Sequence, residues 1–433
     1  MLGASRLSNV FSIRDVRGLL ALDSRGSPTV KAIVRTEGGA IGKAIAPSGA
    51  SRGAREALEL RDGGVRWAGR GVGLALSNIN DVIYPRIKGL DVRAQRIIDY
   101  TLIALDGTHN KSRLGANTIV AVSLAIAKAA SAQTGEPLYR YLGGVNTSII
   151  PVPLMNFING GVHAGNELSF QEFLVAPIGA DSFTEALRIA IELYYALREL
   201  LKSKYGKSAI NVGDEGGFAP PMRLNEDALR TLVDALRVTG YSESHVLLGL
   251  DVAANQIYDS KSSSYKVDGK NMSPGEFLDY IVDLISRYPI VYIEDSFHEE
   301  DFESFSKLTE KIGSKVLVVG DDLYATNTKY LMKGLEVKAT NATLLKVNQI
   351  GTLTEAIDYA NLAYRNGLKV VVSHRSGDSE DDFIADLAVA LNTALIKTGA
   401  PARSERTAKY NRLIEIEEEL GPTAVYPGSR AFI

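Results

Sequence analysis

The sequence predicts an α/β protein built from a smaller amino-terminal α+β domain, residues 1–144, and a (β/α)8 barrel of the TIM type, residues 145–433. A chain of 433 residues exceeds what one ordinary hydrophobic core organises, so two domains are expected. From residue 152 onward, short apolar runs rich in β-formers alternate with helical stretches over roughly 280 residues. Such sustained alternation favours a barrel over an open sheet.

The amino-terminal domain is expected to begin with strands and continue with helices. Residues 11–46 show short alternating runs broken by the turn signals DSRGSPT and TEGGA, which predict an antiparallel meander of about three strands. Residues 47–53 are small and turn-forming, which predicts a mobile loop and, taken alone, an ordinary connector. Residues 56–61 have helix-forming composition, and periodicity predicts helices over 76–106 and 117–133. The last of these is rich in alanine, as in a helix packed closely on both sides.

The barrel is expected from nine strand-like runs and the helices between them. The apolar runs are VPLMNFI, EFLVAPI, INVG, VLLGLDVA, IVYIED, VLVVGDD, TLLKVN, VVVSHR and ALIKTG. The intervening helices are expected at 183–202, 226–239, 274–288, 352–366 and 381–391, with a closing helix over 404–420.

Composition excludes several classes of protein and site. The net charge of −3 and the pI near 6.1 argue against a general nucleic-acid binder, which would carry a basic surplus. The absence of cysteine excludes disulfides, thiolate metal sites and cysteine nucleophiles. No apolar run approaches the ~18 residues of a membrane span, and the first residues lack a continuous apolar signal region. We therefore expect a cytoplasmic protein without a membrane or nucleic-acid partner.

Charged and polar side chains stand where successive barrel strands end. A single acid in that place is usually a helix N-cap, but lysine and arginine are poor caps, so the whole series predicts a shared site. The carboxyl ends of barrel strands meet at one face, where active sites form. The series comprises Asp251, Glu294, Asp295, Asp321, Asp322, Lys346, His374, Arg375, Ser376 and Lys397.

Three acids on neighbouring strands form a hard oxygen site of the kind that suits Mg²⁺. The alternative is an ion-pair network with Lys346 and Lys397. Crowded carboxylates repel one another and their pKa values rise, and a divalent cation relieves this better than two long lysines do. The sequence therefore favours a metal site.

The chemistry expected at this face is proton removal next to a metal-bound carboxylate. Lys346 is the candidate base, and a cationic neighbourhood would lower the pKa of its amine toward working pH. Arg375 and Ser376 resemble an anion clamp. Glu215, in NVGDEGGFAP, is the candidate acid, because a partly desolvated glutamate can keep its proton near neutrality.

His163 and the Gln171–Glu172 pair are further candidates. A lone histidine is more often structural than functional. In NGGVHAGN, however, the flanking glycines and the nearby glutamine and glutamate favour a functional position.

The sequence resembles the enolase family, the glycolytic phosphopyruvate hydratases, almost from end to end. The motifs that carry the resemblance are DSRGSPTV, PSGASRG, LDGTHNKSRLGAN, MNFINGGVHAGN, NVGDEGGFAP, LLKVNQIGTLTE, SHRSGDSEDDFIADLAV and IKTGAPARSERTAKYNRL. The resemblance implies an enolase-type barrel and reversible dehydration of 2-phosphoglycerate to phosphoenolpyruvate in glycolysis and gluconeogenesis. A lysine base beside Mg²⁺ is itself an established pattern of the enolase superfamily.

The resemblance also implies a role for each candidate residue. Asp251, Glu294 and Asp321 would hold one Mg²⁺, and Ser51, in the 47–53 loop, would reach a second that arrives with substrate as the loop closes as a lid. Lys346 would take the proton from carbon 2, and Glu215 would protonate the departing 3-hydroxyl, with Glu172 and His163 nearby. The residues implied in substrate binding are His163, Gln171, Glu172, His374, Arg375, Ser376 and Lys397.

The chain departs from the family pattern at a few positions. Arg52 stands where threonine is usual, Ser27 replaces asparagine and Ser296 replaces proline. Lys31 and Glu415 reverse two charges, normally glutamate and arginine, that pair across the dimer interface in relatives. Reversal of both signs preserves attraction, so we expect a homodimer with Lys31 of one subunit facing Glu415 of the other. The alternative is two unrelated surface charges, since exposed pairs are weak.

Two other functions are weighed against a hydratase. Racemases or cycloisomerases of the same superfamily lack the paired Glu172 and Glu215 and the phosphate clamp. A non-catalytic protein derived from the family would have lost a metal-binding acid or Lys346, and this chain has all of them.

Overall fold

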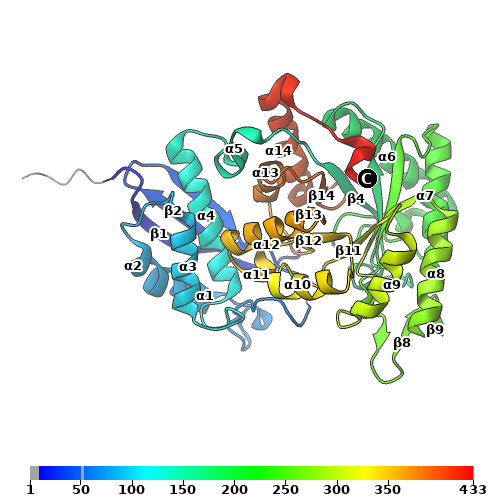
Figure 1. Ribbon diagram of the computed structural model, residues 1–433, viewed down its shortest axis with the longest axis horizontal. Coiled ribbons are helices and arrows are strands. Elements are labelled where there is room, and N and C mark those ends of the chain that lie inside the picture. Colours follow the sequence, from blue (N-terminus) through cyan, green and yellow to red (C-terminus); the bar gives the residue numbers. More distant parts are fainter. Residues whose placement is uncertain (1–8, 50–52, 433) are drawn as a thin grey trace, which may run out of the picture.

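The computed structural model describes residues 9–49 and 53–432. A three-stranded sheet with helices on one side lies next to a closed barrel of eight strands, as Figure 1 shows. The predicted α/β class, with a TIM-type barrel and a smaller α+β part, is confirmed.

The predicted meander is present at the amino terminus. Strands β1 (Ile13–Leu22), β2 (Pro28–Thr36) and β3 (Ile41–Ile45) pair antiparallel in that order. Helix α4 (Ala116–Thr134) is buried over nearly its whole length and packs on β2 and β3. A Cβ placed on Gly42 of β3 would lie 2.0 Å from the carbonyl oxygen of Ala125, so the helix backbone rests directly on this glycine.

The helix predicted over 76–106 is interrupted. It consists of α1 (Gly73–Ser77), a π-helical stretch (Asn78–Ile83), α2 (Tyr84–Ile87) and α3 (Gln95–Asp106). The chain leaves the helical conformation at Lys88, with ψ 131°, and Gly89 follows with φ 80°. A turn of this kind is available to glycine at no steric cost, so the break follows from a residue that periodicity alone ignores.

The prediction of a helix over residues 56–61 is wrong. The Ala57 and Leu58 amides donate to the carbonyl oxygens of Gln349 and Asn110, each at 2.8 Å. Because these backbone bonds go to distant segments, the stretch is not helical despite its composition.

The barrel closes through eight strands in the order β4-β5-β6-β10-β11-β12-β13-β14. Their bounds are β4 Val152–Asn159, β5 Glu172–Pro177, β6 Val246–Asp251, β10 Ile290–Glu294, β11 Leu317–Gly320, β12 Ala342–Leu345, β13 Lys369–Ser373 and β14 Leu395–Lys397. Strand β5 runs antiparallel to both neighbours, whereas the other pairs are parallel.

One of the nine predicted strands, INVG, is not part of the barrel. Its first residue ends a 3-10 helix (Lys207–Ile210), and Val212 makes only an isolated bridge to Phe218. The Gly213 amide bonds back to the Gly217 carbonyl at 2.8 Å, which closes a tight turn around Glu215.

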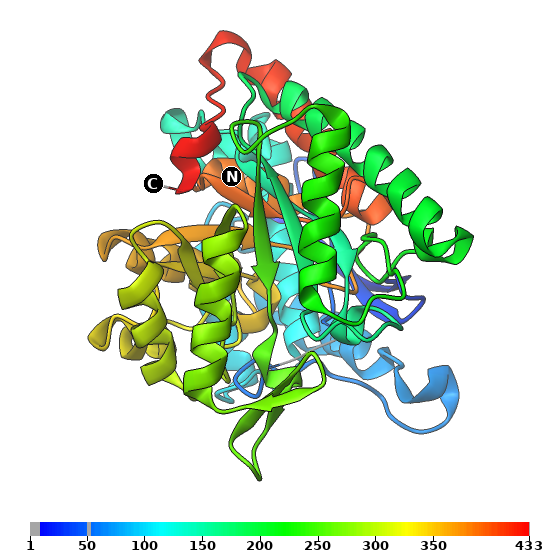
Figure 2. The same cartoon turned by 90° about the vertical axis from the view of Figure 1, so that its right-hand side faces the viewer.

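Helices surround the barrel strands, as Figure 2 shows. Their bounds are α5 Leu138–Gly143, α6 Phe183–Tyr205, α7 Asn225–Thr239, α8 Pro274–Arg287, α9 Phe302–Ile312, α10 Thr328–Glu336, α11 Val347–Ile350, α12 Leu353–Arg365, α13 Phe383–Ala390 and α14 Ser404–Leu420. A small sheet that was not predicted, β7 (Tyr258–Asp259), β8 (Ser264–Val267) and β9 (Lys270–Met272), projects from one end. Within the described ranges, no helix is both long and apolar enough to cross a bilayer.

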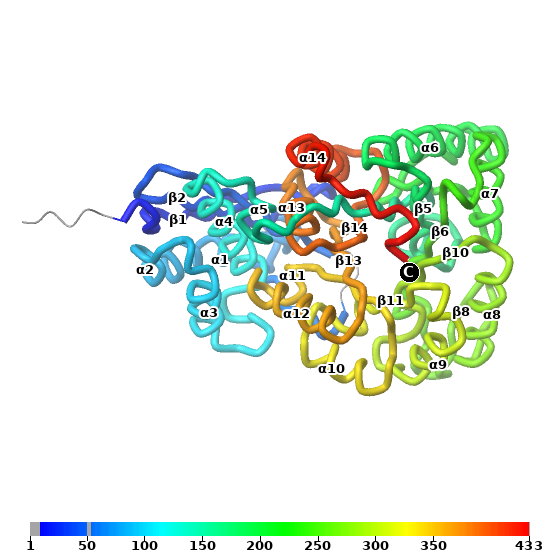
Figure 3. Tube along the Cα trace, turned by 45° about the horizontal axis from the view of Figure 1, so that its top comes forward, coloured from blue at the N-terminus to red at the C-terminus, as the bar shows by residue number. Residues whose placement is uncertain are grey.

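The amino-terminal helices contact the barrel beside the segment that follows Lys346. Helices α3 and α4 lie against α12 and α11, as Figure 3 shows. Asp99 of α3 accepts from the Thr354 amide at 3.0 Å, and Ser123 of α4 accepts from the Leu353 amide at 3.0 Å. The first turn of α12 is therefore capped by side chains from the other part of the molecule.

Candidate active site

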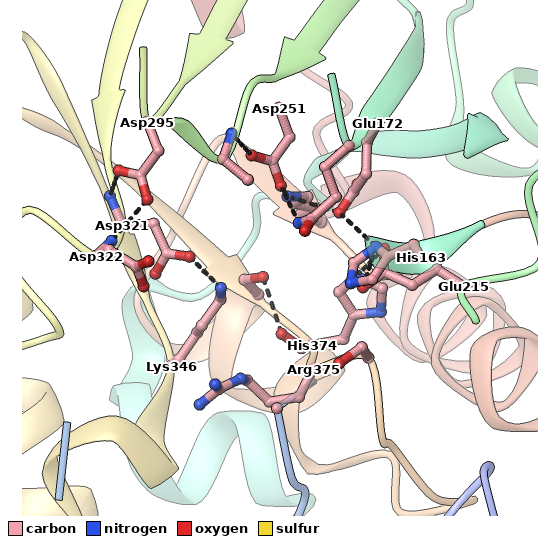
Figure 4. Close-up of a pocket in the computed structure, with 16 residues that line it drawn as sticks. His163, Glu172, Glu215, Asp251, Asp295, Asp321, Asp322, Lys346, His374 and Arg375 are labelled. Atoms are coloured by element: carbon pink, nitrogen blue, oxygen red, sulfur yellow. Dashed lines mark hydrogen bonds and ion pairs between the residues drawn. The ribbon is translucent and has the colours of Figure 1, made fainter. Parts of the chain in front are cut away.

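The predicted strand-end residues converge on one pocket at the mouth of the barrel. About 420 Å³ of space not filled by atoms, part of it open solvent, lies between the residues that line the pocket. Of the predicted residues, the pocket is lined by His163, Gln171, Glu172, Glu215, Asp251, Asp295, Asp321, Asp322, Lys346, His374, Arg375, Ser376 and Lys397, whereas Glu294 is not among the lining residues. Figure 4 shows ten of the lining residues with labels. Sequence reasoning therefore located the pocket, although it missed contributions from elsewhere in the chain.

Ser51 lies outside the described residues, but its neighbours are placed. The amides of Ser48 and Gly377 each donate to the other's carbonyl oxygen at 2.8 Å. Gly49 lines the pocket. The segment that leads to Ser51 is thus joined directly to the segment after Ser376.

The reversed direction of β5 places Glu172 in the pocket. Glu172 is the first residue of this strand, and it pairs with Asp251, the last residue of β6. Because β5 runs against its neighbours, its amino end lies at the mouth where the other strands have their carboxyl ends. The Gln171 side chain also reaches Asp251, with Nε2 3.2 Å from Oδ2.

Lys346 is held by Asp321. The amine forms an ion pair with Asp321 Oδ2, and Gln349 Nε2 donates to Oδ1 at 2.9 Å. Thr326 Oγ donates to Gln349 Oε1 at 2.7 Å and accepts from the Lys346 amide at 2.9 Å. Burial favours the neutral amine, but Asp321 outweighs it and raises the pKa of Lys346 to about 12. In this arrangement the pKa of Lys346 is therefore raised and not lowered, contrary to the expectation from the sequence.

Asp295 and Asp322 extend the acidic side of the pocket. Asp295 accepts from the backbone amides of Asp321 and Asp322, at 2.8 and 2.9 Å, and Asp295 itself has φ 45°. Asn255 donates to Asp322 at 3.0 Å. Burial raises the pKa of Asp295 well above the ordinary value, and its acidic neighbours raise it further.

Lys397 is the centre of the second acidic group. Its amine lies 2.8 Å from Glu294 Oε2, 2.9 Å from Asp251 Oδ2 and 3.3 Å from Glu172 Oε1. Tyr292 donates a further bond to Glu294 Oε2 at 2.7 Å. Four side chains from β5, β6, β10 and β14 are tied together in this way.

The donor set fits a hard cation. Glu294 Oε1 is buried and has no hydrogen-bond partner, so this oxygen can bind a cation without breaking a hydrogen bond. Burial, reinforced by Asp251, raises the pKa of Glu294 to about 7, which is the response expected of crowded carboxylates. The two lysines hold the implied acids apart, because Asp251 and Glu294 bind Lys397 while Asp321 binds Lys346.

Two clusters in the described part of the chain bring potential metal-binding atoms within 4.8 Å of one another. They are His163 with Glu172 and Glu215, and Asp295 with Asp321 and Asp322. The trio that the resemblance implies, Asp251 with Glu294 and Asp321, is not among them.

Glu215 and the histidines form the opposite side of the pocket (Figure 4). His374 Nε2 lies 3.3 Å from Glu215 Oε2, and Asn156 donates to the same oxygen at 3.3 Å. His163 Nδ1 lies 3.9 Å from Glu215 Oε1 and 3.8 Å from Glu172 Oε1. Both glutamates and both histidines are buried.

The directions of the pKa shifts of the two glutamates differ from those expected. Burial raises the pKa of Glu172 well above the ordinary value, and Glu215 adds to the rise. For Glu215, His374 and His163 oppose the effect of burial and lower the pKa. Burial also lowers the pKa of His374 to about 4, so only a neutral imidazole supports Glu215 at pH 7. The direction of the Glu215 shift is therefore the reverse of the expectation that desolvation keeps this glutamate protonated near neutrality.

Arg375 is paired with an acid that the sequence did not single out. Its Nη1 and Nη2 lie 2.9 and 3.0 Å from the two carboxylate oxygens of Glu56, and Nη1 also donates to Asn348 Oδ1 at 3.1 Å. This two-pronged contact is how a guanidinium binds a planar anion, so the clamp geometry exists. Glu56 lies in the non-helical 56–61 segment, far from the barrel in sequence.

Comparison with known proteins decides the family. Residues 13–142 match the model "Enolase, N-terminal domain", and residues 147–433 match "Enolase, C-terminal TIM barrel domain". The enolase of Pyrococcus furiosus is 57% identical over 98% of this chain and 99% of its own length. The enolase of Methanocaldococcus jannaschii is 57% identical over 95% and 96%, and that of Aeropyrum pernix 55% over 97% of each.

The chain belongs to the enolase family. Enolases are metal-dependent hydro-lyases that interconvert 2-phosphoglycerate and phosphoenolpyruvate, and this chain is an enzyme of that class. The racemase and non-catalytic alternatives are thereby set aside.

Proposed function

We propose that the pocket dehydrates 2-phosphoglycerate with Lys346 as the base and Glu215 as the acid. The observation that carries this assignment is their opposition across one pocket. Lys346 stands with Asp321 on one side and Glu215 with His374 on the other, as Figure 4 shows. Anti removal of a proton and a hydroxyl from adjacent carbons requires groups on opposite faces of the substrate.

We also propose that each site binds two Mg²⁺ ions, of which one is resident and the other arrives with the substrate. Asp251, Glu294 and Asp321 would hold the first, and Ser51 would reach the second. When bound, Mg²⁺ supplies positive charge beside the substrate carboxylate, where negative charge accumulates, and competes with Lys346 for Asp321. Without a full ion pair to Asp321, Arg375 and Lys397 would hold the pKa of Lys346 lower.

Arg375 and Ser376 would bind the substrate phosphate, with His374 beside them. The fork of Arg375 already holds a carboxylate, that of Glu56. We expect the phosphate to take the place of this carboxylate, because a dianion binds a guanidinium more strongly than a single carboxylate does. Lys397, Gln171, Glu172 and His163 would contact the substrate carboxylate and hydroxyl.

The protein is proposed to work in the cytoplasm as a homodimer with Lys31 of one subunit facing Glu415 of the other. Lys31 lies in the middle strand of the amino-terminal sheet. The Glu415 carboxylate is 65% exposed and is held by Arg412 at 3.0 Å. An exposed acid held in one position by its own helix is suited to pairing with a partner.

Conversion of 2-phosphoglycerate, followed by the absorbance of phosphoenolpyruvate, tests this proposal. We expect absorbance to rise with Mg²⁺, to stop on chelation and to resume when Mg²⁺ is restored. A rate that survives complete chelation would contradict the metal assignment, and no rate at any metal concentration would contradict the activity.

A further inference from the structure

Arg406 is a fully buried arginine whose guanidinium faces the phosphate-side loop. It lies in the first turn of α14 and is 0% exposed. Its Nη1 donates to the Arg375 carbonyl at 2.6 Å, and its Nη2 donates to the carbonyls of Ser376 and Asp214 at 2.7 and 3.1 Å. These bonds tie the loop after β13 to the turn that carries Glu215.

A fourth contact of Arg406 has a chemical consequence. Nη1 lies 2.5 Å from His374 Nδ1. A guanidinium has donors only and stays charged in proteins, so Nδ1 must be the acceptor and carry no proton. A neutral imidazole then has its proton on Nε2, and this atom lies 3.3 Å from Glu215 Oε2.

The other states of His374 are excluded by the same contacts. A proton on Nδ1 would face the N–H of Arg406, donor against donor. The Nε2 lone pair would then face a carboxylate oxygen, acceptor against acceptor. A doubly protonated ring would keep the first of these clashes and add a like charge beside Arg406, consistent with the lowered pKa of His374.

We infer that Arg406 is a positioning residue that fixes the Nε2–H tautomer of His374 and thereby reserves Oε1 of Glu215 for the catalytic proton. Glu215 Oε2 accepts from the side-chain amide of Asn156 at 3.3 Å, and the Nε2–H of His374 lies 3.3 Å from the same oxygen, without the alignment of a full hydrogen bond. A proton on Oε2 would oppose both of them. When Glu215 carries the catalytic proton, that proton therefore sits on Oε1, the oxygen on the His163 side of the carboxyl. This second step rests on the proposed role of Glu215 as the acid.

The tautomer can be read directly in the unaltered protein. Two-bond ¹H–¹⁵N spectra of ¹⁵N-histidine-labelled protein resolve the rings of five histidines, and the spectrum of His374→Gln identifies the signal that disappears. We expect a protonated Nε2 and an unprotonated Nδ1 at pH 7. An Nδ1–H tautomer or an imidazolium would overturn the inference. This measurement does not depend on the proposed reaction.

The catalytic consequence is tested with Arg406→Lys and Arg406→Met. We expect turnover to fall by about 100-fold, within the range for a lost general acid, while exchange of the carbon 2 proton in D₂O stays within about twofold. A purely structural role would lower both rates together, and unchanged turnover in a folded variant would overturn the positioning role. Arg412→Lys, on the same helix but bonded to Asp386 at 2.9 and 3.0 Å, is the matched control and should alter neither rate.

The two experiments separate the two claims. If the parent protein neither exchanges the carbon 2 proton nor turns over, the proposed function fails and the tautomer result still stands. If the parent protein is active but the ring carries its proton on Nδ1, only the inference about Arg406 fails.

Discussion

Each cation of the pocket neutralises specific acids. Lys397 contacts three carboxylates and Lys346 contacts Asp321, so the acidic strand ends can be buried together. A buried charge without a partner would destabilise the folded protein far more than a charge in one of these ion pairs does. The same contacts mean that either lysine becomes available for chemistry only when its acids acquire another partner.

Arg375→Lys tests the anion clamp at the residue scale. Lysine keeps the charge but loses the fork that now holds both oxygens of Glu56. A lost charged hydrogen bond costs about 1.5–3 kcal/mol, so we expect KM for 2-phosphoglycerate to rise by about 10- to 100-fold. Steady-state kinetics at saturating Mg²⁺ measure the change. An unaltered KM would place the phosphate elsewhere.

The sequence predicted the residues that end strands better than those that arrive from outside the barrel. Asp251, Lys346 and Lys397 were found because each follows an apolar run. Glu56 was missed because its contact with Arg375 spans 319 positions and leaves no local pattern. Arg406 was missed because an arginine in a charged helical stretch resembles a surface residue, although this one is fully buried.

At the scale of elements, the direction of β5 was the feature that periodicity did not predict. A buried strand has the same apolar pattern whichever way it runs. Only the connection from β4 to β5 hints at antiparallel pairing, since residues 160–171 hold no α-helix and a parallel crossover usually contains one. Two helices, α6 and α7, then follow β5 before β6 begins.

The close approach of α4 to β3 gives a test at this scale. Gly42→Ala would place a methyl group 2.0 Å from the Ala125 carbonyl and 2.3 Å from the Ala129 amide. Overpacking against backbone cannot be relieved by a side-chain rotation, so we expect the free energy of unfolding to fall by at least about 1–3 kcal/mol. Chemical denaturation measures this change.

The control is Gly275→Ala, in the first turn of α8. A Cβ there meets no atom within 4 Å. The change should be neutral or should stabilise by about 0.5–1 kcal/mol. Equal losses from both substitutions would show that Gly42 is not a point of contact with the helix.

At the scale of the whole molecule, the proposed contact between Lys31 and Glu415 predicts how two subunits would recognise one another. Lys31→Glu or Glu415→Arg alone would set like charges against each other, and the double variant would restore attraction. We expect each single variant to weaken the dimer by about tenfold, since two symmetry-related pairs are lost and exposed pairs contribute little each. Sedimentation equilibrium measures the dissociation constant.

A second charge reversal on the same sheet serves as the control for the dimer. Lys43→Glu, at an exposed position of β3, changes charge equally without touching the proposed pair. Weakening by Lys43→Glu to the same degree, or no recovery in the double variant, would refute the Lys31–Glu415 contact.

The proposed reaction requires a base and an acid that act separately from opposite sides of one pocket. Exchange of the carbon 2 hydrogen of 2-phosphoglycerate in D₂O, followed by NMR alongside phosphoenolpyruvate formation, tests this most directly. We predict that Lys346→Ala loses both reactions, while Glu215→Gln still exchanges the hydrogen but forms product at least about 100-fold more slowly. Exchange that persists in Lys346→Ala would contradict the account.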